Sequence, residues 1–329
     1  MRACVVMISM NQTTSTPASP APPSSSGYAD VNGLHLYYED YDEQRTTTTK
    51  RPLVLLHGGM LNIELNFADL IPRLAPRHRV IAVELQGHGR TADIERVISP
   101  ANSASDVIAL LDHLGIDRAH VLGHSMGGAV TWQLVQEDSD LVAGVVAVAA
   151  AYPANVVARS HVVSDDGNVA VIDFADTGVR MTVDRRMMNL YGDGYVYQQA
   201  IATSTRFPEG FVDAMRAGLV GLPPRMLLQR LGVIEGMPVV DRPAGFAAKR
   251  VRLLTGGEDP AHTREIEERT IELLRSFGAD AELVWLPDLG INGNGHFLMF
   301  ERNSDEILDV LSEQIDAVSR VPTPDRGGQ

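Results

Sequence analysis

Residues 119–128 read Ala-His-Val-Leu-Gly-His-Ser-Met-Gly-Gly, and this stretch decides the fold. The apolar run at 119–122 is typical of a buried strand, and residues 127–137 have a helical pattern. Between them, Gly123-x-Ser125-x-Gly127 fits a turn so tight that the residues two before and two after the serine must lack side chains. A glycine-rich phosphate loop is the alternative, but the chain has neither G-x-G-x-x-G nor a Walker lysine. The context therefore predicts that Ser125 is a nucleophile.

A serine nucleophile needs a base to accept its proton and an acid to orient that base. Among ten histidines we expect His296 to be the base, because it follows the glycine- and asparagine-rich loop 290–295 and directly precedes a helical pattern. We expect Asp259 to be the acid, since it follows an apolar strand after a short glycine turn. Glu258 and Asp288 remain alternatives for the acid.

Two backbone N–H groups must also face the oxygen that becomes negative during attack on a carbonyl. Met126, directly after the serine, is expected to supply one of them. Gly59, in the His57-Gly58-Gly59 turn after an earlier strand, is expected to supply the other, with Met60 as the alternative.

The rest of the chain alternates strand and helix patterns. A hairpin is predicted around Asn32-Gly33, between strands at 28–31 and 34–41. Apolar runs without in/out alternation predict a parallel sheet covered by helices on both faces; they lie at 52–56, 79–85, 141–150, 251–254 and 281–286. Helices are expected at 101–114, 262–277 and 297–318.

The domain organisation follows from where the alternation of strand and helix patterns is interrupted. Residues 27–151 and 246–319 are predicted to form one α/β domain, and 152–245, with short amphipathic pieces and no strong strand pattern, an insertion. The leader 1–26 and the tail 320–329 are predicted to be disordered.

The amino-acid composition limits which classes of binding partner are expected. With 28 Lys and Arg against 42 Asp and Glu, the net charge of −14 argues against nucleic acid and anionic membranes as partners. Cys4 is the one cysteine, and there is no H-E-x-x-H, so we expect no metal site and no cofactor. The leader is a poor signal peptide, which favours a cytoplasmic protein with export as the alternative. The sequence leaves the oligomeric state open.

Taken together, the motifs resemble those of the α/β-hydrolase superfamily. The resemblance covers about 28–151 and 246–318 and rests on motifs at residues 57–59, 87–91, 123–128, 257–259 and 295–297. It implies an eight-stranded, mostly parallel sheet with helices on both faces and a helical lid inserted after the sixth strand. Glu84 departs from the aspartate common in relatives, and we expect its role to be structural. The 290–296 loop is similar to that of bacterial esterases, some of which take the acid from the segment after the sixth strand; here the first carboxylate in that segment is Asp165.

A serine in this position implies a hydrolase that works through an acyl-enzyme, with Ser125, His296 and Asp259 as its triad. We expect a small or medium, largely neutral carboxylic ester or lactone as substrate. A C–C bond hydrolase or a cofactor-free perhydrolase with the same triad is the alternative, and a non-catalytic ligand-binding protein on the same fold is a third.

Overall fold

The computed structural model describes residues 22–42, 51–59, 61–153, 155–156, 161–165, 169–174, 179–184, 239–259 and 261–320. Most of the expected leader, the short helical pieces expected between 185 and 232, and the tail beyond 320 lie outside these residues. The first strand begins at Ser25, two residues before the expected start of the core.

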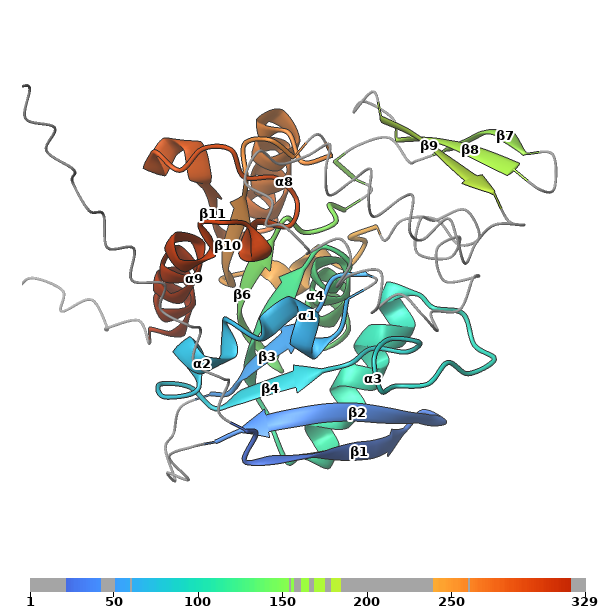
Figure 1. The fold of residues 1–329 in the computed structure, drawn as a ribbon, viewed down its shortest axis with the longest axis vertical. Coiled ribbons are helices and arrows are strands. Elements are labelled where there is room, and N and C mark those ends of the chain that lie inside the picture. The colour runs from blue at the N-terminus through green and yellow to red at the C-terminus, as the bar shows by residue number, and fades with distance from the viewer. Residues whose placement is uncertain are drawn as a thin grey trace, which may run out of the picture.

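Eight strands form one sheet in the order β1-β2-β4-β3-β5-β6-β10-β11 (Figure 1). The strands are β1 (Ser25–Val31), β2 (Leu34–Tyr41), β3 (Leu53–Leu56), β4 (Val80–Val83), β5 (Ala119–His124), β6 (Val142–Val148), β10 (Arg250–Thr255) and β11 (Asp280–Trp285). β2 is antiparallel to β1 and β4, and all the other pairs are parallel. The predicted eight-stranded, mostly parallel sheet is confirmed.

Helices cover both faces of this sheet. One apolar layer contains residues of α3 (Pro100–His113), α4 (Met126–Glu137) and α8 (Arg264–Ser276), and the other contains residues of α1 (Ile63–Phe67), α2 (Ile71–Leu74) and α9 (Ser304–Ser319). Short 3₁₀ turns lie at η2 (Pro243–Phe246), η3 (Leu286–Leu289) and η4 (Leu298–Phe300). In β3, Val54 and Leu56 enter the first layer while Leu53 and Leu55 enter the second. Both faces of the strand are therefore apolar, which explains the unbroken apolar run in the sequence.

The insertion leaves the sheet after β6 and returns at β10, which pairs directly with β6 through Val145 and Val251. Its described part holds a three-stranded antiparallel sheet of β7 (His161–Asp165), β8 (Val169–Phe174) and β9 (Val179–Asp184). The expectation that 152–245 has no strong strand pattern is wrong for this part, while the expected helical pieces of the lid lie outside the described residues. The missed signal is a series of β-branched residues with an Asp-Gly dipeptide at 166–167, a combination typical of hairpins.

The expected helix at 297–318 is also not continuous. The chain makes the short turn η4, becomes extended at Glu301 (φ −78°, ψ 166°), and begins α9 at Ser304. The Glu301 side chain is buried and accepts hydrogen bonds from the loop that precedes His296. This tertiary contact holds Glu301 out of a helical conformation.

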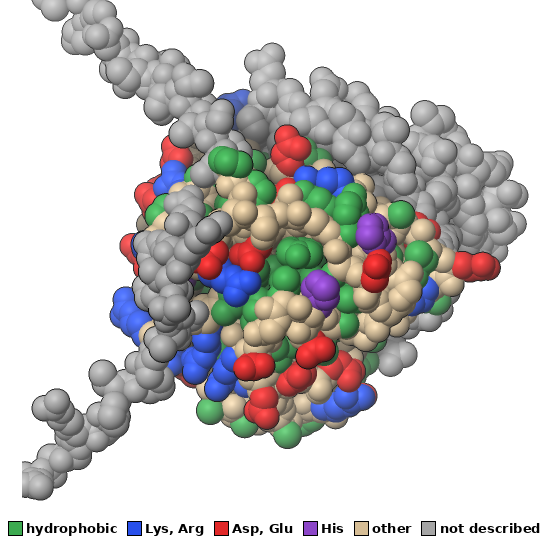
Figure 2. Space-filling model, turned by 90° about the horizontal axis from the view of Figure 1, so that it is seen from below, with side chains coloured by type: hydrophobic (Ala, Val, Ile, Leu, Met, Phe, Trp, Pro, Cys, Tyr) green, Lys and Arg blue, Asp and Glu red, His purple; other side chains and the backbone are tan. Residues whose placement is uncertain are grey.

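Within the described residues, no helix is long and apolar enough to cross a bilayer. On the face seen in Figure 2, acidic and basic side chains lie interspersed around an apolar centre, and the visible described residues form no broad basic field. The predictions of a cytoplasmic location and of no nucleic-acid partner stay predictions.

Candidate active site

Ser125 occupies the turn between β5 and α4, and its backbone has an unusual conformation. Its φ of 51° and ψ of −113° lie in a region that non-glycine residues seldom adopt. A Cβ on Gly123 would lie 2.4 Å from the carbonyl oxygen of Gly127, and one on Gly127 would lie 2.1 Å from that of Leu56. These obstacles are backbone atoms, so glycine is required on both sides of the serine.

His296 lies between Ser125 and Asp259. Its Nε2 is 2.9 Å from Oγ of Ser125, and its Nδ1 is 2.7 Å from Oδ2 of Asp259. Because the carboxylate can only accept, Nδ1 carries the ring proton and Nε2 is free to accept the serine proton. These three residues, 37 and 171 positions apart in the sequence, form one continuous hydrogen-bonded line.

The Asp259 side chain is fully buried and yet remains ionised. Burial opposes the charge, but attraction to His296 and His262, the hydrogen bond from His296 and one from the backbone of Ala261 together lower the pKa of Asp259 to about 2. The carboxylate that orients the imidazole therefore keeps its negative charge across the physiological range.

The other carboxylates that the sequence left open do not approach His296. Glu258 is exposed, and its backbone N–H bonds the carbonyl oxygen of Asn294. Asp288 is exposed and forms a two-pronged ion pair with Arg264. Asp165 ends β7, and its side chain lies outside the described residues.

The loops that carry His296 and Asp259 are tied together by residues that the sequence did not single out. Glu301 accepts from the backbone N–H of Gly295 at 2.8 Å and from the side-chain amide of Asn294. A Cβ on Gly256 would lie 2.4 Å from the carbonyl oxygen of Asn294, so the two loops touch directly. A glutamate directly after the apolar run 297–300 is the sequence signal that could have indicated this support.

The backbone N–H groups of Gly59 and Met126 have no hydrogen-bond partner among the described residues. Gly58, by contrast, donates its N–H to the side-chain oxygen of Asn66 at 2.8 Å. Met60 lies outside the described residues. The donors expected to face an oxyanion thus have no partner in the described part of the chain, and the turn is supported by Asn66, a residue that the sequence did not reveal.

A buried polar network fixes the turn that contains Gly59. The fully buried ring of His57 donates from Nδ1 to the carbonyl oxygen of Gly58 and accepts at Nε2 from the N–H of Leu85. Burial lowers the pKa of His57, so the neutral ring that this pattern requires is also the favoured form. His57 is therefore a structural part of the turn, and its Nε2 is engaged by backbone.

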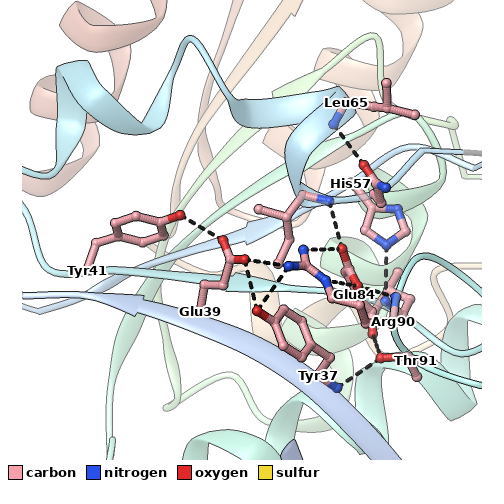
Figure 3. A network of polar contacts seen from close by, with 11 residues as sticks. Tyr37, Glu39, Tyr41, His57, Leu65, Glu84, Arg90 and Thr91 are labelled. Atoms are coloured by element: carbon pink, nitrogen blue, oxygen red, sulfur yellow. Dashed lines mark hydrogen bonds and ion pairs between the residues drawn. The ribbon is translucent and has the colours of Figure 1, made fainter. Parts of the chain in front are cut away.

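Figure 3 shows how this network continues into the ion pairs of Glu84. Glu84 is fully buried and receives Nη2 of Arg90 at 2.7 Å and Nε at 3.1 Å. Arg90 also reaches Glu39 at 2.9 Å, and its guanidinium lies 3.9 Å from the centre of the Tyr37 ring. The structural role expected for Glu84 fits these contacts, because the next residue, Leu85, donates its N–H to His57 in the turn that contains Gly59.

Asp259, His262 and His296 also offer ligand atoms within 4.8 Å of one another, a group that could be considered for a metal. However, Nδ1 of His296 is engaged by Asp259, and Nδ1 of His262 is engaged by Glu267. The arrangement fits proton transfer, because each imidazole already has a carboxylate partner.

Comparison with solved structures shows that the fold of the chain is shared by other proteins. It matches Est816, described as an N-acyl homoserine lactone degrading enzyme, with a TM-score of 0.63 and 23% identity over 87% of this chain and 99% of the other. A thermophilic esterase from Thermogutta terrifontis gives 0.61 and 20% identity over 91% of this chain and 100% of the other. At these identities the likeness establishes the fold alone.

Curated relatives match over shorter segments. A soluble epoxide hydrolase from Corynebacterium sp. is 34% identical over 112 residues, which are 34% of this chain and 37% of that protein. The acetyltransferase component of the acetoin cleaving system of Pseudomonas putida is 49% identical over 82 residues, which are 24% of this chain and 21% of that protein. The chain thus aligns with well under half of either relative. The sequence profile of the alpha/beta hydrolase family, by contrast, matches residues 53–310, and the chain belongs to that family.

Proposed function

We propose that this protein is a serine hydrolase that cleaves a carboxylic ester or a lactone through an acyl-enzyme. The observation that carries the proposal is the line from Oγ of Ser125 to Nε2 of His296 (2.9 Å) and from Nδ1 of His296 to Asp259 (2.7 Å). Structural neighbours described as an esterase and as a lactone-degrading enzyme support this substrate class.

The first half of the reaction forms the acyl-enzyme. Oγ of Ser125 attacks the carbonyl carbon while Nε2 of His296 takes its proton, and the resulting imidazolium is stabilised by Asp259. The carbonyl oxygen becomes negative and accepts hydrogen bonds from the N–H groups of Gly59 and Met126. When the intermediate collapses, the C–O bond to the alcohol breaks, and Nε2 returns the proton to the departing oxygen.

The second half releases the acid. Water gives a proton to Nε2 of His296 and attacks the acyl carbon, and Ser125 leaves with that proton restored. With an ester the products are an acid and a free alcohol. With a lactone the alcohol stays attached to the acyl chain, so the product is one hydroxy acid.

Labelling with a fluorophosphonate probe and peptide mass mapping tests the nucleophile. The adduct is expected on Ser125 in the wild type, to be absent in Ser125→Ala, and to form at a strongly reduced rate in His296→Ala at neutral pH. Asp288→Asn, which changes an exposed carboxylate near the same loop, serves as the matched control and should label normally. An adduct on another residue, or folded wild-type protein that does not react, contradicts the proposed mechanism.

A substrate panel then tests the reaction class. Esters of graded acyl length, lactones of graded ring size and a vinylogous diketone are each assayed with wild type and Ser125→Ala. Turnover of esters or lactones that disappears in Ser125→Ala supports the proposal. Turnover of the diketone alone would make the protein a C–C bond hydrolase, and ester turnover that persists in Ser125→Ala would refute the acyl-enzyme.

A further inference from the structure

A second histidine–carboxylate pair lies against the proposed triad. Nδ1 of His262 is 2.8 Å from Oε1 of Glu267, and the two side chains are 5% and 0% exposed. The His262 ring stacks on that of His296 with 5.3 Å between centroids and 24° between planes. Nothing in the sequence around His262 distinguished it from the other histidines, and the proposed reaction does not use it.

The surroundings of Glu267 indicate the charge of this pair. A carboxylate in the protein interior is costly unless a positive charge and hydrogen bonds compensate it. Oε1 of Glu267 receives the hydroxyl of Thr255 at 3.2 Å and the ring of His262, while Oε2 has no hydrogen-bond partner in the described structure. Among the described residues, His262 is the cationic group in contact with Glu267, so an ionised Glu267 requires a protonated His262.

The groups around His262 agree with that charge. Burial opposes protonation, but attraction to Asp259 and the hydrogen bond and charge of Glu267 raise the pKa of His262 to about 9. The remaining ring neighbours are Tyr152, which meets it edge-on at 5.7 Å, and His296. Beyond His296 lies His124, whose pKa burial and the nearby histidines lower to about 3, so that its ring is neutral.

Resting on the proposed function, we propose that His262, held protonated by Glu267, is a positioning residue for the Asp259–His296 pair. Its positive charge compensates the buried Asp259 carboxylate. The same charge, stacked on His296, opposes a second positive charge on that ring. The order of charges runs Glu267 negative, His262 positive and Asp259 negative.

The test removes each member of the pair without changing its size greatly. His262→Gln removes the positive charge itself, and Glu267→Gln removes the carboxylate that holds His262 protonated. Protonation of His296 is therefore expected to become easier in both variants. The acidic limb of the kcat/KM–pH profile is expected to move to higher pH by about 2 units, as two unit charges ~5 Å apart at an effective dielectric of ~20 imply. Above that limb the rate should stay within about tenfold of the wild type, because His296 is then unprotonated in all variants.

Arg264→Gln is the matched control. It also removes one positive charge from the α8 segment, but Arg264 is exposed and paired with Asp288 and Glu268. Its acidic limb should move by less than about 0.2 units, because solvent screens that charge. If His262→Gln and Glu267→Gln lower the rate at every pH and leave the limb in place, the pair is merely structural and the inference is wrong.

A spectroscopic measurement keeps the inference testable if those variants do not fold. In Ser125→Ala protein labelled with ¹⁵N-histidine, the His262 ring is expected to show imidazolium shifts at pH 7.5 and to titrate near pH 9. A neutral His262 ring at pH 7 would overturn the inference. Failure of the proposed function would look different, because ester and lactone turnover would then be absent from the wild type or would survive in Ser125→Ala, whatever the charge of the His262 ring.

Discussion

Asp259→Asn tests the proposed site most directly, because it replaces the carboxylate by a neutral amide of almost the same volume. The Asp259 carboxylate accepts on both sides, from Nδ1 of His296 at 2.7 Å and from the N–H of Ala261 at 3.0 Å. An asparagine amide has one acceptor and one donor end, so it cannot satisfy both neighbours. If the oxygen stays with Ala261, the amide N–H faces the ring and favours the tautomer whose protonated Nε2 cannot accept the serine proton.

The expected loss follows from the charge that disappears. A carboxylate and an imidazolium about 4 Å apart attract by about 4 kcal/mol at an effective dielectric of ~20. That attraction acts when His296 is protonated in the transition state, so its loss corresponds to a decrease in kcat of about 10³. The wrong tautomer adds to this decrease.

The assay is steady-state hydrolysis of a p-nitrophenyl ester between pH 6 and 9, with kcat and KM determined separately. Glu258→Gln and Asp288→Asn are the controls, since both carboxylates are exposed and neither contacts His296. We expect KM to change little in Asp259→Asn and both controls to keep wild-type kcat within about threefold. If Asp259→Asn kept more than a tenth of the wild-type kcat, or either control lost as much as Asp259→Asn, the reasoning would be refuted.

Three further predictions concern packing and charge. Gly127→Ala would place a methyl group 2.1 Å from a backbone carbonyl oxygen of β3 and should destabilise the protein by about 3 kcal/mol or more. The control Gly27→Ala, whose added methyl group has nothing within 4 Å, should change the stability by less than about 1 kcal/mol. Urea unfolding compares the two variants, and equal stabilities would contradict the steric argument. Glu84→Gln removes the fully buried carboxylate that pairs with Arg90, so the free energy of unfolding should fall by about 3 kcal/mol in the same assay. The kcat should also fall, because the turn that contains Gly59 loses its support; unaltered unfolding and turnover would show that the network is dispensable. The pKa of His262 is raised to about 9, so the stability gained from its positive charge is complete below about pH 6.5 and is lost as the pH rises through 9. Between pH 7 and 9.5 the Tm of the wild type should therefore fall by about 5 °C more than the Tm of His262→Gln. A calorimetric pH series in which the two Tm curves run parallel would contradict this prediction.

The sequence by itself determined the sheet, its parallel direction and the turn at Ser125. Apolar runs report burial on both faces, and the glycines at 123 and 127 report a local clash with backbone, so each signal lies within a few residues of the feature it predicts. The same locality explains two wrong expectations. The strands β7, β8 and β9 lie in an insertion where no strand was expected, and the last helix breaks at Glu301, whose side chain bonds Asn294 and Gly295.

Only the tertiary structure decided which carboxylate meets His296 and what surrounds that contact. Asp259, Glu258 and Asp288 all follow strands near the same edge of the sheet, but Asp259 alone among them is buried against the ring. His262 and Glu267 are only five residues apart, but the burial of this pair and its stacking on His296 arise from the tertiary structure. Pattern and periodicity show that a side chain is buried, but the direction in which it points and the charge it meets depend on the packing of elements distant in the chain.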